Sequence, residues 1–229
     1  MWQFSSCLKA SGTVYKNVSQ ILYEIMLNTI LNYIREHSGC ILEPEEINII
    51  NSSFEVIKLK KKELLLKAGN TNRYYGFIVY GATRQFYICE KGVEHTIKLA
   101  LESRWVGDME SFLSKKTSMY NIEAWEDTEL YVISFVNFKQ LVKKSPAFEK
   151  TLLVMEEKNA ISAQFRLNAY KSLNAGPRYN AFLERYPDLF VRFPSHVIAS
   201  FIGIKKETFS RIKKSAIGKN RQARTRTIM

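Results

Sequence analysis

The spacing of apolar positions divides the chain into segments with different periodicities. Apolar residues recur at helical spacing over residues 26–36, and a second helix is expected to begin at Pro44, whose neighbours are acidic. Residues 54–135 alternate short β-branched and aromatic runs with glycine-containing turns. Helical spacing returns over residues 136–144 and resumes after Pro146 in a run to residue 173 that lacks Gly and Pro. We therefore predict helices, then a β-rich segment, then a second helical part.

The β-rich segment contains several runs that are typical of strands. These runs are residues 54–59, 63–69, 76–88, 95–101, 121–124 and 129–134. The sequence Glu-Lys-Gly at residues 90–92 separates two of them and predicts a hairpin. Strands at such short spacing favour a compact antiparallel β barrel or roll, so the fold class is α+β.

Residues 194–215, PSHVIASFIGIKKETFSRIKKS, do not fit a single amphipathic helix. The apolar positions, spaced +4, +2, +5 and +3, are Ile198, Ile202, Ile204, Phe209 and Ile212. One helix would repeat at about +3 or +4. Two helices that meet at Gly203, with Ile204 in the corner and Ala199 allowing close approach, explain this spacing. The pattern is typical of a helix-turn-helix unit, whose second helix enters the major groove of DNA.

The excess positive charge is concentrated near the C-terminal end. The chain has a net charge of +12, from 34 Lys and Arg against 22 Asp and Glu. Residues 160–229 hold 14 of the basic residues and only 3 of the acidic ones, a net of +11. A segment with so few acids is typical of a protein that binds a polyanion. Nucleic acid is the first candidate, and an anionic membrane surface is the second.

The helix-turn-helix interpretation leaves a polar face on the second helix. Arg or Lys can bond guanine O6 and N7, and Glu can accept a hydrogen bond from cytosine N4. The residues expected to read bases are Lys206, Glu207, Ser210, Arg211 and Lys214. Contacts with phosphates, which add affinity without sequence information, are expected from Lys205, Thr208, Lys213, Lys219, Arg221, Arg224 and Arg226. For each lysine, simple solvation is the alternative.

The chain is expected to divide at its changes of periodicity. The predicted parts are an N-terminal extension at 1–25, a roll at 26–145, a long helix at 146–175 and a helix-turn-helix domain with a basic tail at 176–229. A translation start at Met26 would explain the extension. Gly176-Pro177 is the candidate boundary after the long helix.

The long helix carries a candidate dimer seam. Val154, Ile161 and Phe165 are spaced +7 and +4, as in a coiled coil, although Lys158 falls within the seam. The alternative is a long helix that packs on its own domain.

Two separate parts of the chain resemble the Crp/Fnr family of bacterial transcription regulators. Residues 203–212, GIKKETFSRI, are similar to the family's recognition segment. Residues 76–113 and 122–134 resemble its cyclic-nucleotide-binding-type roll, and together with residues 180–204 they are close to versions in Bacteroidetes-type members. The resemblance covers about residues 26–215, and the two domains occur in the family's order.

The resemblance implies a fold and a function. It implies a double-stranded β-helix roll, a dimerisation helix, and an all-α, winged-helix-like domain that carries the helix-turn-helix. It also implies a cytoplasmic homodimer on a pseudo-palindromic site in double-stranded DNA, with RNA polymerase as a candidate partner. We therefore expect a sequence-specific transcription regulator with a sensor roll.

The ligand segment departs from the family members that bind cyclic AMP. Those members carry Gly-Glu for the ribose and Arg-Ser or Arg-Thr for the cyclic phosphate, whereas this chain has Gly107-Asp108 and Ser118-Met119. A buried phosphate needs a cationic or multi-donor partner, and only the lysines at 115–116 could replace the arginine. We expect a different effector, or none. The implied effector pocket consists of Gly107, Asp108, Met109, Ser118 and Met119.

Other classes of protein have less support in the sequence. Three isolated cysteines and three isolated histidines argue against a disulfide framework, an iron–sulfur cluster and haem. The sequence has no run of ~18 apolar residues and no secretory signal pattern, so we expect a cytoplasmic protein without a membrane partner. It also has no nucleophile–base constellation, so we expect no enzyme. Two alternatives stay open: a sensor module that regulates a protein partner without specific DNA binding, and a nuclease that docks through the basic module.

Overall fold

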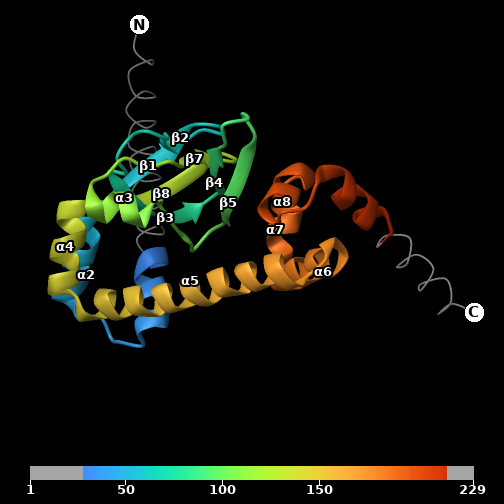
Figure 1. Ribbon diagram of the computed structural model, residues 1–229. Coiled ribbons are helices and arrows are strands. Elements are labelled where there is room, and N and C mark those ends of the chain that lie inside the picture. Colours follow the sequence, from blue (N-terminus) through green and yellow to red (C-terminus); the bar gives the residue numbers. More distant parts are fainter. Residues whose placement is uncertain (1–27, 216–229) are drawn as a thin grey trace, which may run out of the picture.

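The computed structural model describes residues 28–215 and contains an antiparallel β roll followed by helices (Figure 1). The roll consists of two four-stranded sheets with the strand orders β1-β8-β3-β6 and β2-β7-β4-β5. The strands are β1 (Glu55–Leu59), β2 (Leu64–Leu66), β3 (Tyr74–Tyr80), β4 (Thr83–Ile88), β5 (Glu94–Ala100), β6 (Trp105–Val106), β7 (Asn121–Ala124) and β8 (Thr128–Ser134). The predicted antiparallel roll is confirmed, and the Glu-Lys-Gly break is the β4–β5 hairpin.

Long α5 connects the roll to the C-terminal helices, and Figure 1 shows it running along one side of the roll. The helices are α2 (Pro44–Ser53), α3 (Met109–Ser114), α4 (Phe135–Lys144), α5 (Pro146–Ser172), α6 (Ala175–Arg185), α7 (Pro187–Arg192) and α8 (Ser195–Phe201). Residues 28–38 and 206–215 are also helical. Within residues 28–215, none of the helices combines the length and the apolar character that crossing a membrane needs.

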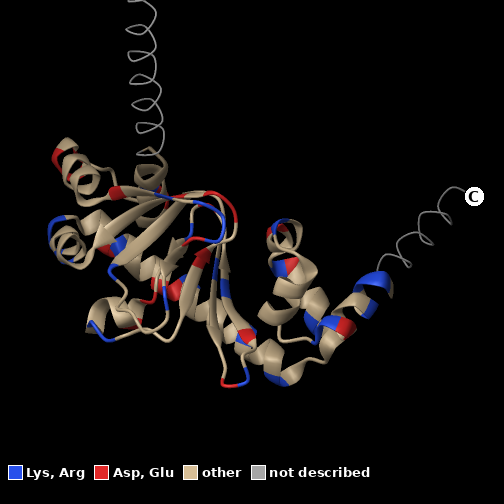
Figure 2. Cartoon of the chain, turned by 90° about the horizontal axis from the view of Figure 1, so that it is seen from above, with Lys and Arg blue, Asp and Glu red and all other residues tan. Residues whose placement is uncertain are grey.

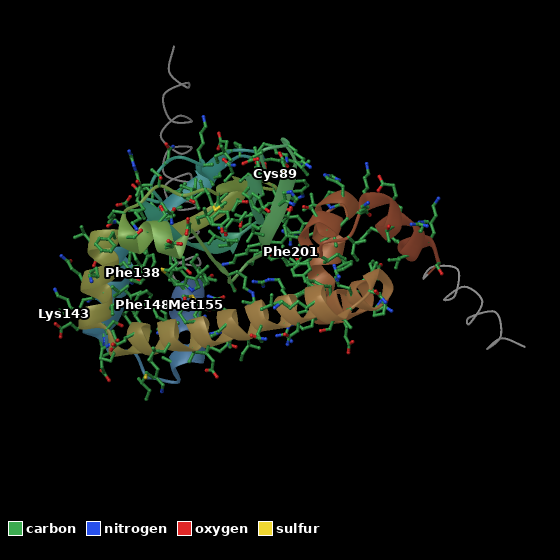
Figure 3. The ribbon with its side chains drawn as sticks, in the orientation of Figure 1. Cys89, Phe138, Lys143, Phe148, Met155 and Phe201 are labelled. Carbon is green, nitrogen blue, oxygen red and sulfur yellow. The ribbon has the colours of Figure 1, made fainter. Side chains whose placement is uncertain are left out.

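The start of α5 packs against the roll through an aromatic core. Phe148 and Met155 of α5 are buried together with Phe138 of α4, Phe77 and Trp105 (Figure 3). The side chain of Ser145 accepts a hydrogen bond from the backbone N–H of Phe148, which caps the helix and fixes where it starts. The first turns of α5 are therefore part of the roll's own core.

Two local features differ from the sequence prediction. The long helix ends at Ser172, and α6 begins at Ala175, so Gly176 and Pro177 lie in the first turn of α6 rather than in the break. Short α3 was not predicted. Its signal in the sequence is Asp108, whose carboxylate accepts a hydrogen bond from the N–H of Ser111 as an N-cap.

Candidate nucleic-acid interface and effector segment

Helix α8 ends at a glycine turn that leads into helix 206–215. Gly203 has φ +64°, and its N–H donates to the carbonyl of Ser200. The N–H of Ile204 donates to the carbonyl of Ala199 at 2.9 Å. This pair of bonds is a Schellman motif, in which the residue after the helix takes the left-handed conformation that glycine tolerates. The turn predicted at Gly203 is therefore present.

The apolar positions of this unit face inward, as their spacing predicts. Ile198, Ile202, Ile204 and Phe209 are buried, and Ile212 is half-buried. They belong to a cluster whose other aromatic members include Tyr179 of α6, with its ring centroid 5.2 Å from that of Phe209. Burial on this side orients the remaining side of helix 206–215 toward solvent.

The polar residues predicted to contact DNA lie together on that outer side. Lys205, Lys206, Glu207, Ser210, Arg211 and Lys214 are exposed, and Thr208 is half-buried. The guanidinium of Arg211 donates to the hydroxyl of Thr208 at 3.3 Å. Figure 2 shows the Lys and Arg residues along this helix. Lys213 donates to Ser195 at 3.3 Å, while the predicted tail contacts Lys219, Arg221, Arg224 and Arg226 lie outside the described residues.

Arg178 of α6 connects this unit to the end of α5. Its guanidinium donates to the carbonyls of Tyr170 and Leu173 at 3.1 and 2.8 Å, and to the carbonyl of Gly203 at 3.0 Å. The hydroxyl of Tyr170 donates to the carbonyl of Phe201. These bonds satisfy carbonyls at two helix ends at once, so they fix the glycine turn relative to α5.

The C-terminal helices also dock on the roll of the same chain. The backbone N–H of Thr96 in β5 donates to the hydroxyl of Ser200 in α8 at 3.0 Å. Arg192 of α7 forms ion pairs with Glu102 and Glu126 of the roll. Hydrogen bonds from Arg192 and the backbone outweigh the opposing effect of desolvation and hold the pKa of Glu102 below its usual range.

Aromatic rings of the roll pack against the helices that cover it, whereas aliphatic side chains such as Ile78, Leu130 and Val132 form the cluster between the two sheets. The rings of Tyr75 and Trp105 stack with centroids 5.3 Å apart, and the ring of Phe77 meets Trp105 edge-on at the same distance. All three side chains are buried. A Cβ atom at Gly107 would lie 2.6 Å from the Tyr75 ring, so glycine at this position is what lets the ring pack.

The residues of the predicted effector pocket have structural partners or lie at the surface. Asp108 caps α3, Met109 packs against the aromatic core, and Ser118 is buried, with its hydroxyl accepting a hydrogen bond from Tyr120 N–H. Met119 is 62% exposed. Asp108 and Ser118 are therefore held by hydrogen bonds within their own segment, while Met119 lies at the surface, and the effector pocket stays a prediction.

Lys98 of β5 is a charged group that the sequence did not single out. Its ammonium group donates to the carbonyl of Trp105 at 2.9 Å. Desolvation, with a further contribution from Arg166, lowers its pKa to about 8, while Glu156 opposes the shift. Arg166 and Glu156 belong to α5 and the Trp105 carbonyl belongs to β6, so the local sequence of β5 does not reveal these neighbours.

The exposed side of α5 carries apolar side chains. Leu153, Ile161 and Leu167 are 69%, 53% and 47% exposed, and Val154 is half-buried. Phe165, by contrast, packs within its own chain, with ring centroids 5.3 Å from Phe182 and 6.1 Å from Tyr186. Long helices with such exposed apolar side chains commonly pair with another helix. Of the three residues in the predicted seam, Ile161 is the one that is more than half exposed.

The sequence of the roll is similar to one known domain family. Residues 56–145 match the cyclic nucleotide-binding domain. This cyclic nucleotide-binding domain comprises the strands from β1 to β8 together with α3 and α4. The sequence comparison with curated proteins gave no significant match.

Solved structures resemble the cyclic nucleotide-binding domain together with the helices that follow it. FixK2 from Bradyrhizobium japonicum matches with a TM-score of 0.64 and 16% identity, covering 73% of this chain and 86% of that one. The c-di-GMP responsive global regulator CLP of Xanthomonas campestris matches with a TM-score of 0.60 and 14% identity, covering 78% and 93%. The fold is therefore that of Crp/Fnr-type regulators.

A third structure agrees with this fold. A CooA mutant from Carboxydothermus hydrogenoformans matches with a TM-score of 0.57 and 18% identity, covering 72% of this chain and 76% of that one. At these identities the likeness concerns the fold. The Bacteroidetes-type origin stays a prediction.

Proposed function

We propose that the protein is a sequence-specific, DNA-binding transcription regulator that acts as a homodimer. The observation that carries the proposal is helix 206–215, which buries Phe209 and exposes Lys206 and Arg211. A helix held in this way by a preceding helix and a glycine turn can enter the major groove. The fold shared with Crp/Fnr-type regulators supports the same function.

The exposed face of α5 is the proposed dimer contact. Leu153, Ile161 and Leu167, with Val154, would pair with the same residues of a second copy. Two copies of helix 206–215 would then meet two half-sites of a pseudo-palindromic operator. RNA polymerase is a further proposed partner of the bound dimer.

We propose that the roll is a sensor domain that does not bind cyclic AMP. Ser118-Met119 stands where the cyclic AMP-binding members carry an Arg-Ser or Arg-Thr pair. A buried phosphate in such a site would lack its cationic partner. An effector of another class is therefore the proposed regulator.

The first test is binding to duplex DNA. An operator selected from random duplexes should bind tightly, and the affinity should fall steeply as salt rises, because phosphate contacts release counterions. A sensor module that regulates only a protein partner would give no selected sequence. Cleavage of the duplex in the presence of magnesium or manganese would instead support the nuclease alternative.

The second test separates base reading from phosphate contact. Arg211→Ala should reduce the preference for one base pair of the operator by about 1–3 kcal/mol, because its exposed guanidinium can reach a base edge. Replacing Arg224 and Arg226 by Ala should weaken binding to all sequences alike. Competition titrations with single-base operator variants measure both effects. If Arg211→Ala lowers the affinity for operator and for random DNA equally, Arg211 is not a base-reading residue.

A further inference from the structure

A cleft of about 820 Å³ opens on the outer side of the roll. It lies where the segment between β2 and β3 meets the C-terminal end of α3 and the first residues of α4. Figure 1 shows α3 and α4 at the opposite end of the molecule from helix 206–215. The cleft-lining residues do not include Gly107, Asp108, Met109, Ser118 or Met119. The cleft is therefore lined by residues other than the DNA-contact residues and the implied effector pocket, although it adjoins that pocket, because Asn72 donates to the carbonyl of Asp108 and Ser118 N–H donates to the carbonyl of Asn70.

Three basic side chains line the cleft without an acidic residue beside them. Lys67, Arg73 and Lys115 form no ion pair with any residue in the range 28–215. The backbone of Lys115 is held at φ +62°, and its ammonium group lies 3.6 Å from the centroid of the Phe135 ring. Desolvation lowers the pKa of Lys115. Uncompensated positive charge at this cleft favours an anion.

The walls of the cleft supply an apolar surface next to these charges. Leu65, Tyr74, Phe135 and Val136 line it. The first turn of the ten-residue α4, which begins at Phe135, also faces the cleft, and the positive end of its dipole adds to the basic side chains. A volume of this size, with apolar walls and a few polar groups, is typical of sites for small organic ligands.

We propose that this cleft binds a small organic phosphate, with the phosphate on Arg73, Lys67 and Lys115 and an apolar or planar body against Tyr74 and Val136. Three cations match the two negative charges of a phosphomonoester, and the planar guanidinium of Arg73 can donate two parallel hydrogen bonds to it. The site does not require DNA binding. A ligand in this cleft would contact the first turn of α4, and α4 is joined to the long helix α5 through the single residue Ser145.

The test is calorimetric titration of the full chain with 1-naphthyl phosphate at low salt. We expect one ligand to bind per chain, with 1-naphthol and 1-naphthoate binding at least about tenfold more weakly. Arg73→Gln and Lys115→Gln should each weaken the binding of 1-naphthyl phosphate by about tenfold or more. Lys143→Gln removes the same charge at the other end of α4 and should leave binding unchanged (Figure 3). Thermal melts without ligand verify that each variant is folded.

The outcomes separate this site from the proposed function. The proposed site is wrong if wild type does not bind 1-naphthyl phosphate, or if Arg73→Gln and Lys115→Gln bind it as tightly as wild type does. Equal binding of 1-naphthol shows an apolar cleft only, and equal binding of 1-naphthoate overturns the preference for phosphate. Duplex binding is measured on the same samples without the ligand. Absence of duplex binding would contradict the proposed DNA-binding function without affecting the proposed ligand site. Absence of ligand binding would contradict the ligand site without affecting the proposed DNA-binding function.

Discussion

At the scale of the residue, position 203 is subject to two constraints that glycine satisfies and that any residue with a side chain would satisfy only with strain. Its φ of +64° is left-handed, and a Cβ atom there would lie 2.5 Å from the Tyr170 ring. Gly176, in the first turn of α6, has neither constraint, because nothing lies within 4 Å of its Cβ position. These two glycines form a matched pair for measuring what the turn requires.

We predict that Gly203→Ala lowers the free energy of unfolding by about 1–3 kcal/mol, through backbone strain and the contact with Tyr170. Gly176→Ala should leave it unchanged or raise it by about 0.4–1 kcal/mol, because alanine reduces the entropy of the unfolded chain. Urea denaturation followed by circular dichroism measures both. Similar effects from the two substitutions would contradict the role given to the turn.

A second residue-scale prediction concerns Lys98, whose pKa is lowered to about 8 from its ordinary 10.5. Between these values the unfolded chain keeps a proton that the folded protein releases, so the contribution of Lys98 to stability rises with pH. Lys98→Met should be more stable than wild type, because methionine removes the cost of burying the charge. This difference in the free energy of unfolding should shrink by up to about 1 kcal/mol between about pH 8 and 9.

Denaturant titrations at several pH values measure this difference. Exposed Lys91, on the β4–β5 hairpin, is the control for the same substitution. A pH-independent difference between wild type and Lys98→Met would contradict the burial of this ammonium group.

At the scale of the element, the orientation of helix 206–215 depends on the junction between α5, α6 and the glycine turn. Arg178 and Tyr170 bond the carbonyls at the end of α8 and in the turn, and Arg178 also bonds the end of α5. Since α5 carries the proposed dimer face, this junction would set the distance between two copies of the helix. An operator with a fixed half-site spacing needs such a rigid connection.

We predict that Arg178→Gln broadens the range of half-site spacings that the protein accepts. The affinity for the selected operator should fall, while operators with one base pair inserted or removed should lose less affinity than they do with wild type. Gel-shift titrations on the spacing series measure this. Lys171→Gln removes the same charge from the exposed last turn of α5 and is the control. A uniform loss across all spacings would assign Arg178 a merely structural role.

At the scale of the whole molecule, the chain exposes an apolar face that a monomer does not need. Leu153, Ile161 and Leu167 lie on the side of α5 that faces away from the buried Phe148 and Met155. Exposed apolar patches of this kind mark association sites. The docking of α7 and α8 on the same chain's roll leaves this face uncovered by the described residues.

We predict that Ile161→Asp converts a dimer into monomers and weakens operator binding by at least about tenfold, because a charge would be buried in the seam. Sedimentation velocity measures the oligomeric state. Val191→Asp, at an α7 side chain that is 84% exposed, is the matched control and should leave the dimer intact. A wild-type monomer, or a dimer unaffected by Ile161→Asp, would contradict the proposed seam.

The elements and the turn were largely predictable from the sequence, because they depend on local periodicity and backbone conformation. The strand runs, the start of α5 at Pro146 and the turn at Gly203 lie where the sequence predicts them, except that the run 76–88 is divided into β3 and β4 by a turn at Gly81. Three short elements were missed, β6, α3 and α7, since two strand residues or six helical residues give little periodic signal.

The sequence by itself determined which side of each element is apolar, and therefore that residues 194–215 form two helices with one polar face. Only the tertiary structure decided which partners those sides meet. Phe165 could have faced a second copy but packs on Phe182, and Arg178 bonds carbonyls up to 25 residues away. The cleft at Arg73 and Lys115 likewise joins segments that are far apart in the chain. Periodicity encodes burial, whereas the choice of partner follows from how the chain closes on itself.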